Sequence, residues 1–162
     1  MAHESRATPP TRLATMIGPA HTEDLAAVFG LLEQSGLPKD GLADHIATTL
    51  VARDGGQIVG GAALELYGTA ALLRSVAVEP ERRGQGLGQR LTQAALDLAR
   101  QRGVRKVYVL TETADGFFTR FGFGRVARTE VPLPVQQSVE FTRACPVTAQ
   151  AMALHVRAED SR

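Results

Sequence analysis

A glycine-rich turn at residues 83–88, with the sequence RGQGLG, is the part of the chain best suited to bind a charged ligand. It lies between a predicted strand and a predicted helix, so its backbone N–H groups lie at a helix N-terminus. Those groups and the helix dipole favour an anion, typically a phosphate. Glycine matters there because a Cβ atom would hold a phosphate away from the backbone. Arg82 and Arg83 add positive charge, so the turn is predicted to bind a phosphate group.

Two common nucleotide-binding motifs do not fit this turn. A P-loop requires Gly-Lys followed by Ser or Thr, and the chain has no such sequence. In the dinucleotide motif Gly-x-Gly-x-x-Gly, counted from Gly84, the third glycine position holds Gln89. That motif also follows the first strand of its domain, whereas this turn comes after several predicted antiparallel strands. The phosphate is therefore expected to belong to another class of ligand.

Charged side chains in predicted central strands are a second group of candidates. Glu65 lies in the middle of ALELY, and Arg74 in the middle of LLRSV. An unpaired buried carboxylate is costly, and a buried guanidinium group needs a carboxylate partner. The partner of Arg74 is either Glu65 on the neighbouring strand, in a structural pair, or the carboxylate of a substrate. We favour the substrate, because a guanidinium group binds a carboxylate through two parallel hydrogen bonds.

The pattern of apolar residues predicts the elements that position these groups. Helices are expected where apolar residues recur every 3.6 residues, and strands in runs rich in Val, Leu and Ala between turns. Helices are predicted over residues 23–34, 42–48, 87–102 and 114–121. Strands are predicted over residues 12–17, 49–53, 57–67, 71–78, 106–111, 125–131, 139–142 and 150–156. Three consecutive antiparallel strands, followed by a parallel strand–helix–strand unit, indicate an α/β fold with one mixed sheet.

Length and composition are those of one globular domain. The chain has 162 residues, of which 44% are hydrophobic, and a net charge of +1, which argues against a dedicated nucleic-acid-binding protein. The single Cys145 cannot form an internal disulfide. No apolar run reaches the roughly 18 residues of a membrane span, and the polar residues 1–10 lack the apolar region of a secretory signal. We expect a flexible leader over residues 1–10 and a single cytoplasmic domain over residues 11–162.

Two motifs resemble those of the GNAT superfamily of N-acetyltransferases. The family signature Arg/Gln-x-x-Gly-x-Gly/Ala lies between a strand and a long helix, and Arg83, Gly86 and Gly88 match it. A downstream signature, Phe-Tyr-x-x-x-Gly-Phe, corresponds to FFTRFGF at residues 117–123. The resemblance implies a mixed sheet of six to seven strands, with splayed central parallel strands and helices on both faces. It also implies acetyl-CoA as cosubstrate, with no metal.

The resemblance further implies which residues contact acetyl-CoA. The pantetheine arm is expected between the splayed strands, against the backbone of Val76, Ala77 and Val78, where one N–H would polarise the thioester carbonyl. The rest of the predicted cofactor site comprises the turn and the start of its helix, together with three residues of the second motif: Arg83, Gly84, Gln85, Gly86, Leu87, Gly88, Gln89, Phe117, Phe118 and Arg120.

For catalysis, the resemblance makes Glu65 the first candidate for the base and Glu112 the alternative. Each has a second interpretation: Glu65 as a solvent-facing side chain, and Glu112 as a solvated acid at a helix start. Many relatives protonate the departing CoA from a tyrosine, where this chain has Phe118. Arg74, Thr111 and Tyr67 are the predicted substrate-binding residues.

Within the superfamily, three segments resemble the GNAT proteins associated with arsenic resistance: LLRSVAV at residues 72–78, LTETA at residues 110–114, and the tail from Glu140-Phe141 through Cys145-Pro146 to Met152. More loosely, the central strand with its arginine and the segment from LT at residues 110–111 to FFTRFGF at residues 117–123 resemble the acetyltransferase domain that makes N-acetylglutamate. This resemblance implies acetylation of the α-amine of a small, glutamate-like amino acid or an arsenical analogue. The alternatives are a protein N-terminal or lysine acetyltransferase and a non-catalytic acetyl-CoA sensor. No nucleic-acid or membrane partner is expected, and both a monomer and a homodimer stay open.

Overall fold

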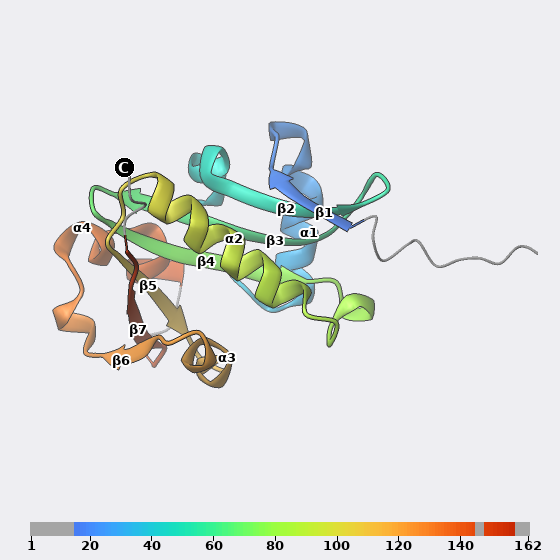
Figure 1. Cartoon of the computed structure of the whole chain (residues 1–162). Coiled ribbons are helices and arrows are strands. Elements are labelled where there is room, and N and C mark those ends of the chain that lie inside the picture. Colours follow the sequence, from blue (N-terminus) through green and yellow to red (C-terminus); the bar gives the residue numbers. More distant parts are fainter. Residues whose placement is uncertain (1–14, 145–147, 158–162) are drawn as a thin grey trace, which may run out of the picture.

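Seven strands form one mixed sheet within residues 15–144 and 148–157, the part of the chain that the computed structural model describes (Figure 1). Their order is β1-β2-β3-β4-β5-β7-β6, and only β4 and β5 pair in parallel. The predicted α/β fold with a mixed sheet is therefore confirmed. The strands are β1 (Thr15–Pro19), β2 (Thr49–Asp54), β3 (Gln57–Tyr67), β4 (Ala70–Val78), β5 (Lys106–Thr111), β6 (Gly124–Val126) and β7 (Gln150–His155).

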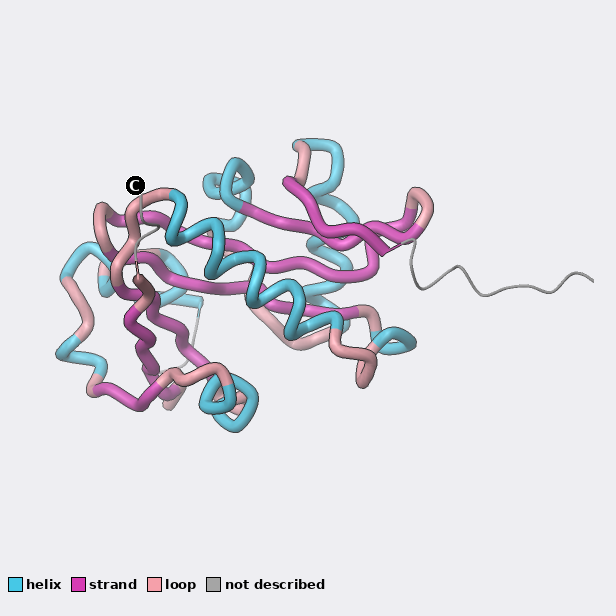
Figure 2. Tube along the Cα trace, in the orientation of Figure 1, coloured by secondary structure: helices cyan, strands magenta, loops and turns pink. Residues whose placement is uncertain are grey.

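Helices cover both faces of this sheet, as the resemblance implies (Figure 2). On one face α2 buries Leu91 and Leu96 against β3 and β4, and on the other α1 buries Leu31 and Leu32. The helices are α1 (Leu25–Gln34), α2 (Leu87–Gln101), α3 (Asp115–Arg120) and α4 (Leu133–Gln136). Shorter helical turns are η3 (Thr22–Asp24), η4 (Leu42–Thr48), η5 (Pro80–Arg82), η6 (Arg128–Glu130) and the π-helical η7 (Glu140–Ala144). No helix among the described residues is long and apolar enough to cross a membrane.

The two parallel strands pair at their beginnings and then separate. Ala70, Ala71 and Leu72 of β4 pair with Lys106, Val107 and Tyr108 of β5, and no later pair exists between the two strands. After these three pairs, β4 continues in pairing with β3 alone, and β5 continues in pairing with β7 alone. Figure 1 shows the ribbons diverging from this point. The expected splay of the central strands is confirmed, and it leaves one edge of β4 without a partner strand.

A β-bulge lies in β4 beside this opening. Ala63 pairs with Arg74 and Gly61 with Ala77, so β4 has one residue more than β3 between these pairs. Ser75, inside this interval, has φ 62° and is the one non-glycine residue of the described ranges with a positive φ. Such a conformation is uncommon for a side-chain-bearing residue. The bulge therefore redirects the strand immediately after Arg74.

Two strand predictions near the C-terminus are wrong. Residues 125–131 do not form one strand: β6 ends at Val126 and η6 follows, because the Glu130 carboxylate accepts a hydrogen bond from the Ala127 N–H at 3.2 Å. Residues 140–142 belong to η7 and not to a strand, because Ser138 accepts from the N–H groups of both Phe141 and Thr142. The leader, part of the predicted strand 12–17 and Cys145 lie outside the described residues.

Candidate active site

A cleft of about 1010 Å³ fills the gap between β4 and β5. One wall is the free edge of β4, and the other consists of the end of β5 and the start of α3. The loop after α1 and Glu140 of η7 complete the lining. Its central lining residues are Arg74, Ser75, Val76, Ala77, Val78, Arg83, Gly88, Thr111, Glu112, Phe117, Phe118 and Glu140.

The glycine turn lies at one end of this cleft. Gly84 and Gly86 have φ values of 80° and 85°, which residues with a Cβ adopt only with strain. Gly86 is the N-cap residue of α2, and the first helical hydrogen bond runs from the Arg90 N–H to its carbonyl at 3.0 Å. The N–H groups of Leu87, Gly88 and Gln89 therefore have no acceptor within the helix. The turn presents them as donors for an anion, as the sequence predicts.

The two arginines of the turn have different roles. The Nε–H of Arg83 donates to the Val78 carbonyl at 3.0 Å, and its Nη2 donates to the Ser35 hydroxyl at 3.3 Å. Arg83 thus lies on the rim of the cleft, between the end of β4 and α1. Arg82 instead forms an ion pair with Asp54 at 2.6 Å and does not line the cleft. Of the two arginines expected to add positive charge at the turn, only Arg83 lines the cleft.

The aromatic residues of the second motif lie on the opposite wall. Phe118 is buried, with its ring edge-on to Phe117 at 5.1 Å and to Phe123 at 5.4 Å between centroids. Both Phe117 and Phe118 line the cleft, and Phe118 stands at the position of the tyrosine in the family motif. Arg120 lies outside this cleft and lines a second hollow of about 360 Å³ with Gly86, Gln89, Arg90, Gln93 and Phe121.

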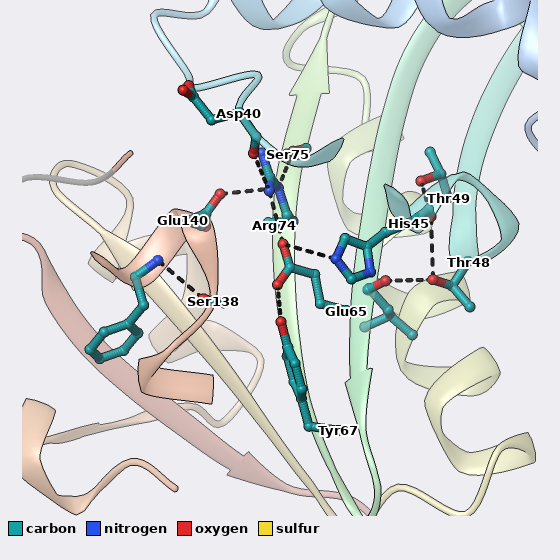
Figure 3. A network of polar contacts seen from close by, with 12 residues as sticks. Asp40, His45, Thr48, Thr49, Glu65, Tyr67, Arg74, Ser75, Ser138 and Glu140 are labelled. Carbon is teal, nitrogen blue, oxygen red and sulfur yellow. Dashed lines mark hydrogen bonds and ion pairs between the residues drawn. The ribbon is translucent and has the colours of Figure 1, made fainter. Parts of the chain in front are cut away.

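A buried polar network stands at the other end of the cleft (Figure 3). Its centre is Arg74, whose side chain is 0% exposed. The Nη1 group donates to Glu65 Oε2 at 2.9 Å, and the Nε lies 3.1 Å from Glu140 Oε1. The Tyr67 hydroxyl donates to Glu65 Oε1 at 2.5 Å, and His45 Nε2 lies 3.7 Å from Glu65 Oε2. Strands β3 and β4 are thereby joined to η4 and η7.

The guanidinium group of Arg74 is almost fully occupied. Besides the two carboxylates, it donates to the Asp40 carbonyl at 2.8 Å, the Pro38 carbonyl at 3.2 Å and the Ser75 hydroxyl at 3.0 Å. Of its five N–H groups, one on Nη2 has no partner among the described residues. Arg74 therefore organises the closed end of the cleft, and its predicted contact with a substrate carboxylate stays a prediction.

The predicted acids and their neighbours occupy different places. Glu112 is exposed on the cleft wall and accepts from the Thr148 hydroxyl at 3.3 Å. Thr111 also lines the cleft, and its hydroxyl accepts from the Ala114 N–H at 2.9 Å. Glu65 and Tyr67 lie behind Arg74, and neither lines the cleft. The roles of all four residues stay predictions.

Glu140 is the residue of this site that the sequence analysis does not identify. It is 4% exposed, lines the cleft and belongs to a segment predicted as a strand. Burial, together with the charge of Glu65 and against the opposing charge of Arg74, raises the pKa of Glu140 from 4.5 to about 7. Burial and the bond to Glu65 also raise the pKa of Tyr67. The signal that the sequence offers is the place of Glu140, beside Phe141, in the tail that resembles the arsenic-resistance GNAT proteins.

The raised pKa of Glu140 predicts a pH-dependent contribution to stability. The folded protein holds the Glu140 proton more tightly than the unfolded chain does. The free energy of unfolding that this proton contributes is therefore complete below pH 4.5 and is lost as the pH rises through about 7. Urea unfolding of the wild type and of Glu140→Gln from pH 4 to 8 should show their difference changing in this window, by at most about 1.4 kcal/mol per pH unit. The exposed Glu23→Gln is the matched control. A difference that is constant with pH would contradict the assignment.

Comparison with known proteins gives a consistent family assignment. Residues 16–123 match the acetyltransferase (GNAT) family. An uncharacterized N-acetyltransferase of Chlorobaculum tepidum is 34% identical over 94 residues, which cover 57% of this chain and 60% of that protein. An amino-acid acetyltransferase of Neisseria meningitidis serogroup B is 28% identical over 122 residues, which cover 70% of this chain and 28% of that protein. The chain therefore spans less than two thirds of either relative.

Solved structures show the same fold. The N-acetylglutamate synthase of Neisseria gonorrhoeae, complexed with coenzyme A and N-acetyl-glutamate, superimposes with a TM-score of 0.77 at 22% identity. The match covers 88% of this chain and 35% of that one. Rv2747 of Mycobacterium tuberculosis, in complex with CoA, gives a TM-score of 0.71 at 23% identity, covering 88% of this chain and 99% of that one.

Proposed function

The chain belongs to the GNAT acetyltransferase family, and we propose that it transfers the acetyl group of acetyl-CoA to the α-amine of a small, amino-acid-like substrate. The observation that carries the proposal is the course of the cleft. It runs from Arg83 and Gly88 of the glycine turn, along the unpaired edge of β4, to the buried charges around Arg74 and Glu140. An elongated cosubstrate and a small amine fit end to end along that course.

The residues at the glycine turn suit the pyrophosphate of acetyl-CoA. Donor N–H groups from Gly84 to Gln89, with Arg83 on the rim, would bind its oxygens. A Cβ added to Gly88 would lie in ordinary van der Waals contact with the Phe117 ring at 3.8 Å, so glycine leaves that space between the two residues unfilled. The pantetheine arm would then lie along Val76, Ala77 and Val78, which line the cleft beside the missing strand pairing.

Two observations support an amino acid as the acceptor. Curated relatives, including that of Neisseria meningitidis, are named amino-acid acetyltransferases, and one solved neighbour contains N-acetyl-glutamate. Arg74 lines the cleft and retains one N–H on Nη2 for a substrate carboxylate oxygen. A glutamate-like amino acid and an arsenical analogue of the arsenic-resistance type both carry the required α-amine and carboxylate.

The site is compatible with direct transfer. The amine nitrogen attacks the thioester carbonyl, and a backbone N–H of β4 would stabilise the oxyanion. Phe118 has no proton to give the departing sulfur, but a thiolate whose conjugate acid has a pKa of about 8.5 needs little help to leave. Glu112 on the cleft wall is the predicted base nearest to solvent, whereas Glu65 does not line the cleft and would act only through water.

The proposal is tested by measuring CoA release from acetyl-CoA with a panel of amines. The panel contains glutamate, other amino acids, an arsenical amino acid, polyamines, aminoglycosides and peptides with free N-termini. We expect the highest kcat/KM for an α-amino acid. Preference for polycations would overturn the substrate class, and preference for peptides would indicate a protein acetyltransferase. Tight acetyl-CoA binding without CoA release would indicate a sensor.

A further inference from the structure

Glu140 combines burial with access to the cleft in a way that no other carboxylate of the described residues does. Its side chain is 5% exposed, yet it forms part of the cleft wall. Its charged partner is Arg74, two residues before the β4 edge that begins at Val76. Glu140 therefore lies at the end of the cleft where the thioester of a cosubstrate placed along Val76 to Val78 is expected.

The competing carboxylates are less well placed to accept a proton from a bound amine. Both oxygens of Glu65 are occupied, one by Tyr67 and the other by Arg74 with His45 nearby, and the side chain does not line the cleft. Asp40 and Glu112 reach the cleft, but both are exposed, and Glu112 is bonded to Thr148.

The surroundings of Glu140 give it a higher proton affinity. Burial favours its neutral form, and the negative charge of Glu65 adds to this effect, while Arg74 opposes it. His45 and Tyr67 contact Glu65 on its far side and complete the titratable groups of the network. With a pKa of about 7, Glu140 is ionised often enough near neutral pH to accept a proton and basic enough to hold it.

We propose that Glu140 is the general base that takes the proton from the ammonium group of the acceptor before the nitrogen attacks the thioester. The inference rests on the proposed acetyl transfer. Arg74 is a positioning residue in this scheme, since its Nε holds one oxygen of the carboxylate at 3.1 Å. The acceptor ammonium group also gains an anionic partner at the closed end of the cleft.

The step balances without any further reactant. The Glu140 carboxylate takes one proton from the ammonium group, and the neutral nitrogen forms a bond with the carbonyl carbon. The tetrahedral intermediate collapses, the carbon–sulfur bond breaks and CoA leaves as the thiolate. The nitrogen loses a second proton as the amide forms, and the thiolate takes up one proton. Glu140 returns its proton to solvent, so one proton is released for each turnover.

The test is the pH profile of kcat/KM for the wild type and for Glu140→Gln, with the best amine of the panel. At pH 7 we expect the variant to be slower by about 100-fold, within the range for loss of a general base. Near pH 10 the α-amine is neutral without assistance, so the two rates should converge. Acetyl-CoA affinity should not change. Glu23→Gln, an exposed carboxylate on η3, should follow the wild type throughout.

The outcomes separate the two proposals. A wild type that acetylates no amine overturns both of them. An active wild type that Glu140→Gln matches at every pH, or trails by the same factor at every pH, overturns only the role of Glu140. If Glu140→Gln fails to fold, Glu140→Asp takes its place. We then expect a slower enzyme that keeps the wild-type pH dependence, and loss of that dependence would overturn the assignment.

Discussion

Replacing Gly86 by valine is expected to weaken acetyl-CoA binding roughly 10- to 100-fold, the loss of about one charge-assisted hydrogen bond of 1.5–3 kcal/mol. Gly86 has φ 85°, a left-handed conformation that is a strong outlier for a β-branched residue. Valine relieves the strain only by rotating the backbone. Because Gly86 is the N-cap of α2, that rotation re-aims the N–H groups proposed to hold the pyrophosphate.

Gly55 provides a matched control for this substitution. It lies in the hairpin between β2 and β3 with φ 62°, and an added Cβ meets nothing within 4 Å. Gly55→Val should therefore lower stability through similar backbone strain and leave the Kd for acetyl-CoA unchanged in calorimetric titrations. Equal loss of affinity in both variants would mean that general destabilisation, and not the turn, limits binding.

Local sequence signals predicted the frame of this site well. The bounds of β3 and β5 match the predicted ranges, and α2 ends one residue earlier than expected. These elements are specified by nearby residues: a hairpin turn, an apolar period, or glycine at a helix end. The glycine turn belongs to the same class, because its geometry depends on its own residues and on the helix that follows.

The closed end of the cleft could not be predicted in the same way. The pair between Arg74 and Glu140 joins a central strand to a distant C-terminal turn, and tertiary packing alone brings them together. The turn itself was predicted as a strand, which placed Glu140 outside the candidate site. A buried arginine requires a carboxylate partner, but the sequence does not show how many carboxylates it contacts. The sequence left Glu65 and a substrate carboxylate as alternatives, with the substrate favoured, whereas the structure places both Glu65 and Glu140 beside Arg74.

Replacing Arg74 by methionine is expected to lower the free energy of unfolding by about 3–5 kcal/mol, the cost of leaving buried charges unpaired. The carboxylates of Glu65 and Glu140 are 1% and 5% exposed and would face each other without a cation. The loss should be larger at pH 8 than at pH 5. At pH 5 the folded protein keeps Glu140 protonated, since its pKa is already raised and removing Arg74 raises it further.

The cause of this loss of stability can be isolated by also removing the two carboxylates that Arg74→Met leaves unpaired. Arg74→Met combined with Glu65→Gln and Glu140→Gln should be more stable than Arg74→Met alone, because no uncompensated charge stays buried. Arg100→Met is the matched control, since it breaks an exposed pair with Asp97 at 2.6 Å and should cost no more than about 1 kcal/mol. If the triple variant is as unstable as the single one, the lost stability comes from the hydrogen bonds of Arg74 to Pro38 and Asp40. Arg74 would then stabilise the fold chiefly by fixing the loop that carries Pro38 and Asp40, and its ion pairs with the two acids would contribute little to the free energy of unfolding.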